Sequence, residues 1–283
     1  MERITVLNFG AGINSCALYA MMEAGDVPPA DVCIFFDLED EPAFIYEQLE
    51  FMKSLAGPPI VVIKPGCLGD NLIQGVNSSG GRFVSIPAFL SANDDGKNTG
   101  IGRRQCTREY KIGPIESAIR NMIGLEPGER MPSDIEVHQI IGLCFDEPKR
   151  VARVRGRFEG RKQWSCGMPL FEEFVRHSEC IDYLSKRFPG RTFRSSRCVF
   201  CPFQDDAEWL DLKEHDPRGF ARAVQIDKAI REPSSACTAG LNAAQYLHRS
   251  CKPLDEVEFK PKDPSRQGKL IFHDFDCDGA CGS

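Results

Sequence analysis

The sequence predicts an α/β protein built on a doubly wound parallel sheet. Short apolar runs rich in β-forming residues alternate with segments of helical periodicity through the first half of the chain. Glycines follow the first apolar run directly, as in a tight strand-to-helix turn. At 283 residues the chain can hold such a sheet and a second, smaller unit. Because parallel sheets are covered by helices, we expect ligands to bind beyond the carboxyl ends of the strands.

The expected elements follow one another closely along the chain. We expect strands at residues 4–9, 31–36, 60–64 and 137–143, and helices from residue 15, at 42–55 and at 112–122. Residues 66–102 are rich in Gly, Asn, Ser and Asp and predict a long loop. In the last third, we expect helices at 205–216, 217–231 and 241–248. The sequence thus predicts an α/β domain at 1–190 and a mainly helical, cysteine-containing cap at 191–283.

The segment after the first predicted strand is the strongest candidate for a binding site. Gly10 and Gly12 allow a tight turn, and Ser15 is a suitable N-cap for the following helix. Backbone N–H groups and the helix dipole would together attract an anion, most often a phosphate chain. The segment has neither the Gly-Lys-Ser/Thr of a Walker A loop nor the third glycine of the dinucleotide fingerprint. A tight turn without a ligand has the same pattern.

Acidic residues follow the second predicted strand. Asp37, Glu39 and Glu41 should reach the same sheet edge as the glycine loop. They could hold Mg²⁺ or a ribose, with Asp37 as the best candidate, or they could form a solvated acidic loop.

The composition points to a reducing, aqueous environment. The chain has 13 cysteines and a net charge of −6, and its N-terminus resembles a strand more than a signal peptide. No apolar run approaches the ~18 residues of a membrane span. We therefore expect a cytoplasmic protein whose thiols are ligands, nucleophiles or packing residues. Cys16, Cys33 and Cys180 lie in apolar patterns, which favours packing.

One cysteine pair has the spacing of a metal site. Two residues separate Cys198 from Cys201 in Cys-X-X-Cys, so both sulfurs can lie on one side of a turn. Further ligands must come from elsewhere, and Cys106 is the first candidate because flanking arginines would stabilise its thiolate. Cys277 and Cys281 in the tail are the next candidates. The alternative is a reduced, packed pair.

Seven basic residues fall within fourteen positions, from Lys149 to Lys162. In an acidic protein this asymmetry suggests binding of ATP phosphates, or of a small-molecule or nucleic-acid acceptor. A solvated flexible loop is the alternative.

Several motifs resemble one family. Residues 9–15 resemble the PP-loop of ATP pyrophosphatases, roughly Ser-Gly-Gly-X-Asp-Ser, from which Ala11 and Asn14 depart. Residues 105–112, 140–147, 196–204 and 276–282 resemble motifs of proteins similar to phosphoadenylylsulfate (PAPS) reductase. This resemblance implies the adenine nucleotide α-hydrolase (HUP-like) fold and cleavage of ATP to AMP and pyrophosphate. The ATP contacts that it implies are Phe9, Gly10, Ala11, Gly12, Asn14, Ser15, Asp37 and Gly142.

The first functional hypothesis is an ATP-dependent enzyme that adenylates its substrate. Mg²⁺, held by Asp37, and arginines such as Arg104 would spread the charge that develops as pyrophosphate leaves. A sulfur nucleophile would then displace AMP and insert sulfur into a nucleobase, nucleotide or other carbonyl compound. Cys106, Cys198 and Cys201 around a 4Fe–4S cluster with one open iron would resemble the sulfur-transferring members of the PP-loop group. Four cysteine ligands would instead suggest structural zinc or a closed cluster.

Two other hypotheses stay open. A sulfonucleotide reductase would use a cysteine thiolate, Cys277 or Cys281, as its nucleophile. The tail lacks the Glu-Cys-Gly-Leu-His segment that such reductases carry. The chain could also be a non-catalytic module that binds a nucleotide or a metal. The sequence leaves the sulfur donor open, and a homodimer is compatible with it.

Overall fold

A five-stranded parallel sheet forms the centre of the chain. The computed structural model describes residues 2–77, 85–91, 100–231 and 243–261. The strand order is β3-β2-β1-β6-β7, and every neighbouring pair is parallel. The strands are β1 (Glu2–Asn8), β2 (Val32–Phe36), β3 (Ile60–Ile63), β6 (Ile135–Ile141) and β7 (Trp164–Gly167). The predicted α/β class is confirmed.

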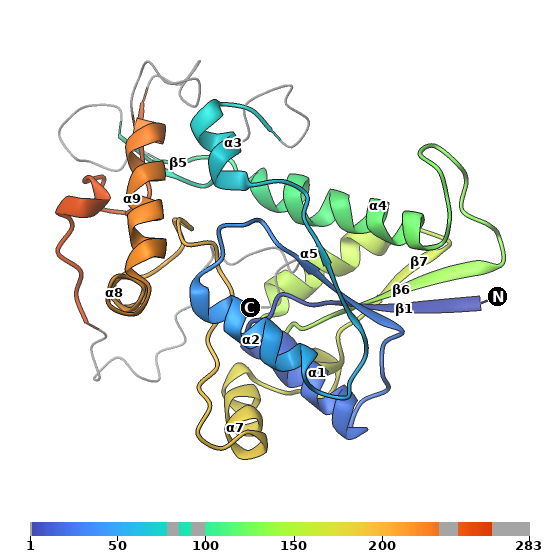
Figure 1. Ribbon diagram of the computed structural model, residues 1–283. Helices are drawn as coiled ribbons and strands as arrows, with labels where there is room; N and C mark the ends of the chain where they lie inside the picture. The colour runs from blue at the N-terminus through green and yellow to red at the C-terminus, as the bar shows by residue number, and fades with distance from the viewer. Residues whose placement is uncertain (1, 78–84, 92–99, 232–242, 262–283) are drawn as a thin grey trace.

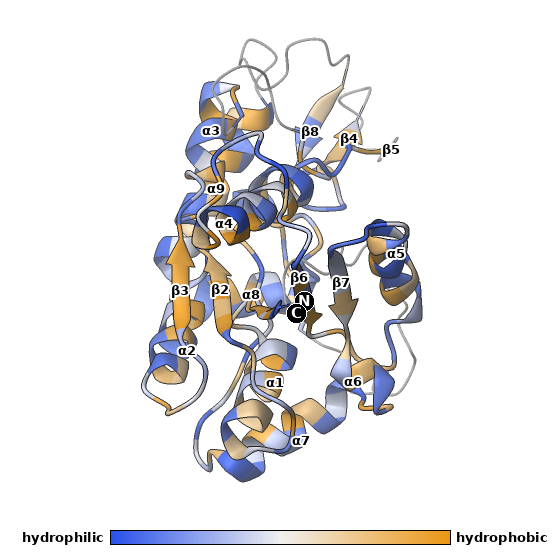
Figure 2. Cartoon of the chain, turned by 90° about the vertical axis from the view of Figure 1, so that its right-hand side faces the viewer, coloured by the Kyte–Doolittle hydropathy of each residue, from blue (hydrophilic) through white to orange (hydrophobic). Residues whose placement is uncertain are grey.

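Helices cover both faces of this sheet (Figure 1). Helices α1 (Ile13–Ala24), α2 (Ala43–Lys53) and α7 (His177–Arg187) pack on one face, where Leu7 and Phe35 belong to the same core cluster. On the other face, α4 (Gly113–Met122) packs on Val6 and Ile34. Helix α5 (Pro148–Phe158) and the short α6 (Pro169–Glu172) border β6 and β7. Figure 2 shows that β2 and β3 are apolar along their length. Strand β2 is buried throughout, as a strand covered on both faces requires, whereas β3 at the sheet edge is only partly buried.

The strand order of the parallel sheet reverses its direction at β1. From β1 it runs to β2 and β3 on one side, whereas β6 and β7 lie on the other. Asn8 at the end of β1 is paired with Ile141 at the end of β6. The carboxyl ends of β1 and β6 therefore form the topological switch point, which is where open α/β sheets bind ligands.

A second hydrophobic cluster lies beside the sheet. It joins α3 (Leu68–Gln74), the π-helix η1 (Arg108–Ile112), α8 (Asp206–His215), α9 (Pro217–Arg231) and the 3₁₀ helix η3 (Leu254–Glu256). An antiparallel sheet of order β5-β4-β8 adjoins them, formed by β4 (Phe89–Ser91), β5 (Gly100–Ile101) and β8 (Ala244–Tyr246). The cluster takes Leu68, Ile86 and Tyr110 from the range 1–190, so its packing does not follow a single boundary at residue 190.

Two local predictions are wrong. The predicted loop 66–102 contains α3, β4 and β5. A helix was predicted at 241–248, but residues 244–246 form β8 instead, because they pair with β4 and the Leu247 amide donates to the buried Asp227. Residues 241 and 242 lie outside the described residues. Most of the basic stretch, residues 149–158, lies in α5, whose Val151 and Val154 pack in one cluster with Ile141, so the alternative of a flexible loop does not apply to that part. Within the described residues, no helix is both long enough and apolar enough to span a bilayer.

Candidate functional site

The glycine loop joins β1 to α1 at the switch point. The Phe9 amide donates to the Ile34 carbonyl at 3.0 Å, after which the backbone turns into the helix. Ala11 has a φ of +55°, in the left-handed region that favours glycine. Gly12 is the N-cap of α1, with extended backbone angles and no capping side chain. The loop therefore has the strand–turn–helix geometry of an anion site built from backbone amides.

Two of the predicted ATP contacts have other local roles. Ser15 is not the N-cap, since α1 begins at Ile13, and its hydroxyl donates to the Gly12 carbonyl at 3.0 Å. The N-cap is Gly12, with its extended backbone, three residues before the predicted N-cap Ser15. The Phe9 ring lies 5.6 Å from the Tyr19 ring within the core. Phe9 can contact a ligand only through its backbone.

The loop after β6 lies directly against the start of α1. A Cβ on Gly142 would lie 3.4 Å from the Asn14 carbonyl carbon and from the Ser15 nitrogen. Gly142 therefore allows a close backbone approach between the two loops of the switch point. Its predicted role as an ATP contact is untested, and its packing role has a clear geometric basis.

Asn14 connects these loops through its side chain. Its Nδ2 donates to Glu147 Oε2 at 3.2 Å, and its Oδ1 lies 2.6 Å from His177 Nδ1. Because the amide nitrogen faces Glu147, Oδ1 must accept from a protonated Nδ1 of His177. Glu147 also accepts from the Cys144 amide at 2.8 Å and from Arg150. The sequence analysis missed His177, since nothing in its local pattern points to a residue 163 positions away.

The loop is enclosed on its other side by Gln48 of α2. Residues 10–15 are all buried. The Gln48 side chain, itself 3% exposed, donates to the Ala11 carbonyl at 2.5 Å. The same amide group accepts from the Arg194 backbone N–H at 2.7 Å and donates to the Arg194 carbonyl at 3.1 Å. Gln48 thus holds the glycine loop, α2 and residue 194 together.

Asp37 lies at the carboxyl end of β2, as predicted, and is bonded to protein groups. Its Oδ1 accepts from the Tyr46 hydroxyl at 2.7 Å and from the Glu39 amide at 2.8 Å. Lys64 Nζ lies 3.6 Å from Asp37 Oδ2 and 3.1 Å from Glu39 Oε1. Burial and the hydrogen bond to Asp37 raise the pKa of Tyr46. A Mg²⁺ ion at Asp37 would have to compete with Lys64.

Two cysteines of the predicted metal site, Cys106 and Cys198, pack against the second cluster, and Cys201 follows in the same turn as Cys198. Cys198 and Cys201 form a tight turn, with the Cys201 amide donating to the Cys198 carbonyl at 2.9 Å. Burial and the carboxylate of Glu41 raise the pKa of the Cys198 thiol, with smaller contributions from Cys201 and Cys106, while Lys111 lowers it. The Cys198 thiol is therefore close enough to Cys201 and to Cys106 for an electrostatic interaction. Glu41 forms a buried ion pair with Lys111 at 3.5 Å.

These thiols do not complete a metal site by themselves. Among the residues that the structure describes, no three His, Cys, Asp or Glu side chains are arranged to hold a metal ion. Cys277 and Cys281 lie outside the described residues. The guanidinium carbon of Arg104 lies 5.3 Å from the centre of the Phe203 ring, next to the cysteine turn.

The other predicted cysteine roles are clear. Cys16, Cys33 and Cys180 are fully buried in the core, so their predicted packing role is confirmed. The Sγ atoms of Cys144 and Cys180 lie 3.6 Å apart.

Part of the basic stretch, in α5 and just after it, forms ion pairs within the protein. Arg150 is buried against Glu147, and Arg161 forms two hydrogen bonds to Glu116, at 2.7 and 3.0 Å. Arg155 lies 3.6 Å from Glu172. Lys149 and Arg153, one helical turn apart, are exposed. Only part of this stretch is therefore accessible to an acceptor.

Comparison with known families and with curated proteins found no match for this chain, so its function is inferred from its motifs and from the geometry of the switch point.

Proposed function

We propose that this chain binds ATP at the switch point between β1 and β6 and cleaves it to AMP and pyrophosphate, which activates an acceptor by adenylation. The observation that carries this proposal is the glycine loop, which leads from the end of β1 into a helix capped by the backbone of Gly12. First-turn amides and the helix dipole favour negative charge at that place. The contact between Gly142 and the start of α1 puts the second loop of the switch point beside it.

In this proposal the backbone amides of residues 10–13 bind the phosphates. Because residues 10–15 are buried, ATP entry would open the hydrogen bonds of Gln48 or Asn14 that enclose the loop. The carboxylates of Asp37 and Glu39 are oxygen donors of the kind that Mg²⁺ prefers, provided that Lys64 moves aside. Mg²⁺, when bound, would neutralise charge on the phosphates. Arg104 remains a candidate for stabilising the leaving pyrophosphate.

Sulfur transfer is the second part of the proposal. The Cys198 thiol is within electrostatic range of Cys106, Cys201 and Glu41, and Glu41 follows the same strand as Asp37. Thiolates are ligands for iron–sulfur clusters and for zinc, so their chemistry suits either group. Since three described ligands do not converge, we assign no chemical step to a 4Fe–4S cluster or to zinc. The metal and sulfide contents of protein purified without oxygen would decide between them.

The test is product analysis with anaerobically purified protein, ATP, Mg²⁺ and a panel of nucleobases, nucleotides and other carbonyl compounds. We expect AMP and pyrophosphate in equal amounts, dependent on an acceptor. Formation of ADP would contradict the proposal, and sulfite release from adenylylsulfate would favour the reductase instead.

Two alanine variants of glycine provide a matched comparison. Gly142→Ala introduces a Cβ at 3.4 Å from the Asn14 and Ser15 backbone, whereas a Cβ on Gly156 in α5 has open space around it. We expect Gly142→Ala to weaken ATP binding and turnover, while Gly156→Ala leaves both unchanged. Equal ATP affinity in the two folded variants would argue against the switch point as the nucleotide site.

A further inference from the structure

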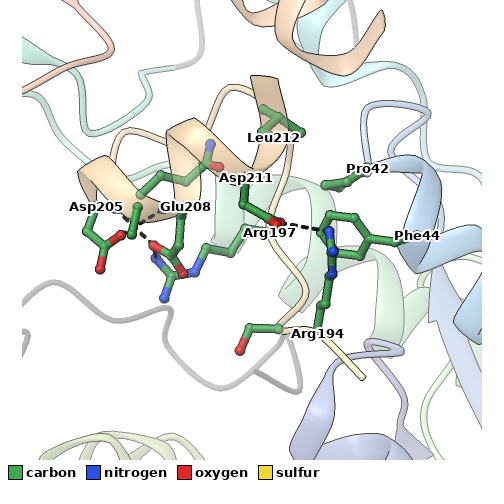
Figure 3. A pocket seen from close by; sticks show the side chains of 11 residues that line it. Pro42, Phe44, Arg194, Arg197, Asp205, Glu208, Asp211 and Leu212 are labelled. Atoms are coloured by element: carbon green, nitrogen blue, oxygen red, sulfur yellow. Dashed lines mark hydrogen bonds and ion pairs between the residues drawn. The ribbon is translucent and has the colours of Figure 1, made fainter. Parts of the chain in front are cut away.

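A pocket of about 320 Å³ lies between the start of α2 and helix α8. Figure 3 shows side chains from α2, from residues 194–197 and from α8 facing this space. Its lining residues are Pro42, Phe44, Arg194, Ser195, Arg197, Gln204, Asp205, Ala207, Glu208, Asp211 and Leu212. None of these residues has a role in the proposed cleavage of ATP. The volume is sufficient for a small organic molecule.

The charged groups of the pocket form two separate ion pairs. Arg194 Nη1 lies 2.7 Å from Asp211 Oδ2, and Arg197 Nη1 lies 2.8 Å from Glu208 Oε2 (Figure 3). All four side chains are partly exposed, between 26% and 38%. Ion pairs of this exposure contribute little to stability, so a ligand that offers the same charges can replace either partner.

The balance of charges selects the class of ligand. Two arginines and three carboxylates line the pocket, which gives a formal charge of −1. A polyphosphate is therefore disfavoured. A ligand with one negative and one positive group could interact with both partners of each ion pair. Its anionic group would face the guanidinium groups, and its cationic group would face Glu208 and Asp211. Asp205 and Glu208 also form the capping box of α8, in which Asp205 accepts from the Glu208 amide at 2.8 Å and Glu208 accepts from the Asp205 amide at 2.9 Å.

The pocket also has an apolar side for the rest of such a ligand. Pro42, Phe44 and Leu212 belong to its lining. The guanidinium carbon of Arg194 lies 4.8 Å from the centre of the Phe44 ring, which holds this cation at the boundary of the apolar and charged sides. We propose that this pocket binds a small zwitterion of the α-amino acid class through the two ion pairs Arg194–Asp211 and Arg197–Glu208.

The pocket is connected to both parts of the candidate site by hydrogen bonds. The backbone of Arg194 is bonded to Gln48, which also holds the Ala11 carbonyl of the glycine loop. On the other side, Gln204 donates to the carbonyls of Val199 and Cys201 at 3.0 and 3.3 Å. If the proposed function holds, the zwitterion would be the acceptor or the sulfur donor. The binding proposal itself does not depend on that function.

The experiment is calorimetric titration of the full chain, at neutral pH and low salt, with each of the twenty standard L-amino acids. We expect saturable binding of at least one of them. Its N-acetyl derivative and its methyl ester each lack one charge. Each should bind at least about tenfold more weakly than the amino acid, since one charge-assisted contact is lost. The absence of binding by every amino acid would overturn the proposal.

Three variants locate the binding site. Arg197→Gln and Glu208→Gln should each weaken binding of the amino acid about tenfold, and glutamine at position 208 still completes the helix cap with Asp205. Arg187→Gln removes a comparable surface pair with Glu23, from α7 to α1, and should leave binding unchanged. Thermal unfolding curves establish that each variant is folded.

Two further outcomes would also overturn the proposal. One is unchanged amino acid binding in both Arg197→Gln and Glu208→Gln. The other is displacement of the amino acid by pyrophosphate, which would assign the pocket to the nucleotide. ATP affinity and turnover, measured in the same variants, separate this proposal from the proposed function. We expect both to be retained in Arg197→Gln when no zwitterion is added.

Discussion

The side-chain amide of Asn14 donates to the carboxylate of Glu147 at 3.2 Å, and this bond joins the helix after β1 to the loop after β6. The two residues are 133 positions apart and meet at the switch point. A neutral amide suits this place because Glu147 already accepts from the Cys144 amide and from Arg150. An aspartate, which the PP-loop pattern has here, would put a second carboxylate against Glu147.

Asn14→Asp should therefore destabilise the fold although it restores the family pattern. Replacing the donated hydrogen bond with like-charge repulsion in a buried setting should lower the free energy of unfolding by about 1–3 kcal/mol at pH 7.5. Urea denaturation measures this change. In the double variant Asn14→Asp/Glu147→Gln the repulsion is removed, so we expect most of the loss to be recovered. A loss of equal size in both variants would mean that repulsion from Glu147 is not the cause.

Ala11→Gly should stabilise the protein. The φ of +55° at Ala11 is unfavourable for alanine and free of strain for glycine. Because glycine also gains entropy in the unfolded state, we expect a net gain of roughly 0.5–1 kcal/mol. Ala152→Gly, at an exposed position inside α5, is the matched control and should cost about 1 kcal/mol. Chemical denaturation of both variants checks the opposite signs, and a destabilised Ala11→Gly would refute the strain at this residue.

Acidification should lower the free energy of unfolding through the buried imidazole of His248. Burial lowers the pKa of this imidazole below its ordinary value, despite the hydrogen bond to Asp206 that favours its charged form. A depressed pKa in the folded state means that the unfolded state binds more protons, so stability is lost as the pH falls below about 6.5. His248→Gln should reduce the slope of unfolding free energy against pH between 7 and 5. The exposed His215 gives the control variant His215→Gln. Equal slopes in both variants would contradict this role of His248.

The cysteines should divide into ligands and packing residues. We expect Cys106→Ala, Cys198→Ala and Cys201→Ala each to lower the metal bound by protein purified without oxygen, while ATP still binds. Cys33→Ala, deep in the sheet core, should reduce stability through its cavity and leave the metal content unchanged.

The tail cysteines complete this comparison. If Cys277 and Cys281 relay sulfur, their alanine variants should keep the metal and lose turnover. Loss of the metal from either tail variant would make the tail a ligand and favour a closed cluster or structural zinc. Metal analysis and absorption spectra distinguish these results.

The sequence by itself determined the features that depend on neighbouring residues. Apolar runs placed β1, β2 and β6 to within two residues, and helical periodicity placed α9 at 217–231. Asp205 was placed at the start of α8, where it is the N-cap. The glycine loop was located because its residues need particular backbone angles. All of these signals arise within one element or one turn, so a local pattern is sufficient to predict them.

Only the tertiary structure decided which side chains surround that loop. Asn14 meets Glu147 and His177, and Gln48 meets Arg194, over separations of 133 to 163 residues. Residues 244–246 became a strand because β4 offered hydrogen-bond partners that no local periodicity predicts. The sequence suggested that the stretch containing Arg150 and Arg161 binds phosphates or an acceptor, or forms a solvated loop, yet folding paired these two arginines with Glu147 and Glu116. Such pairings depend on the packing of distant elements, because partners and burial are set only when the layers of the fold come together.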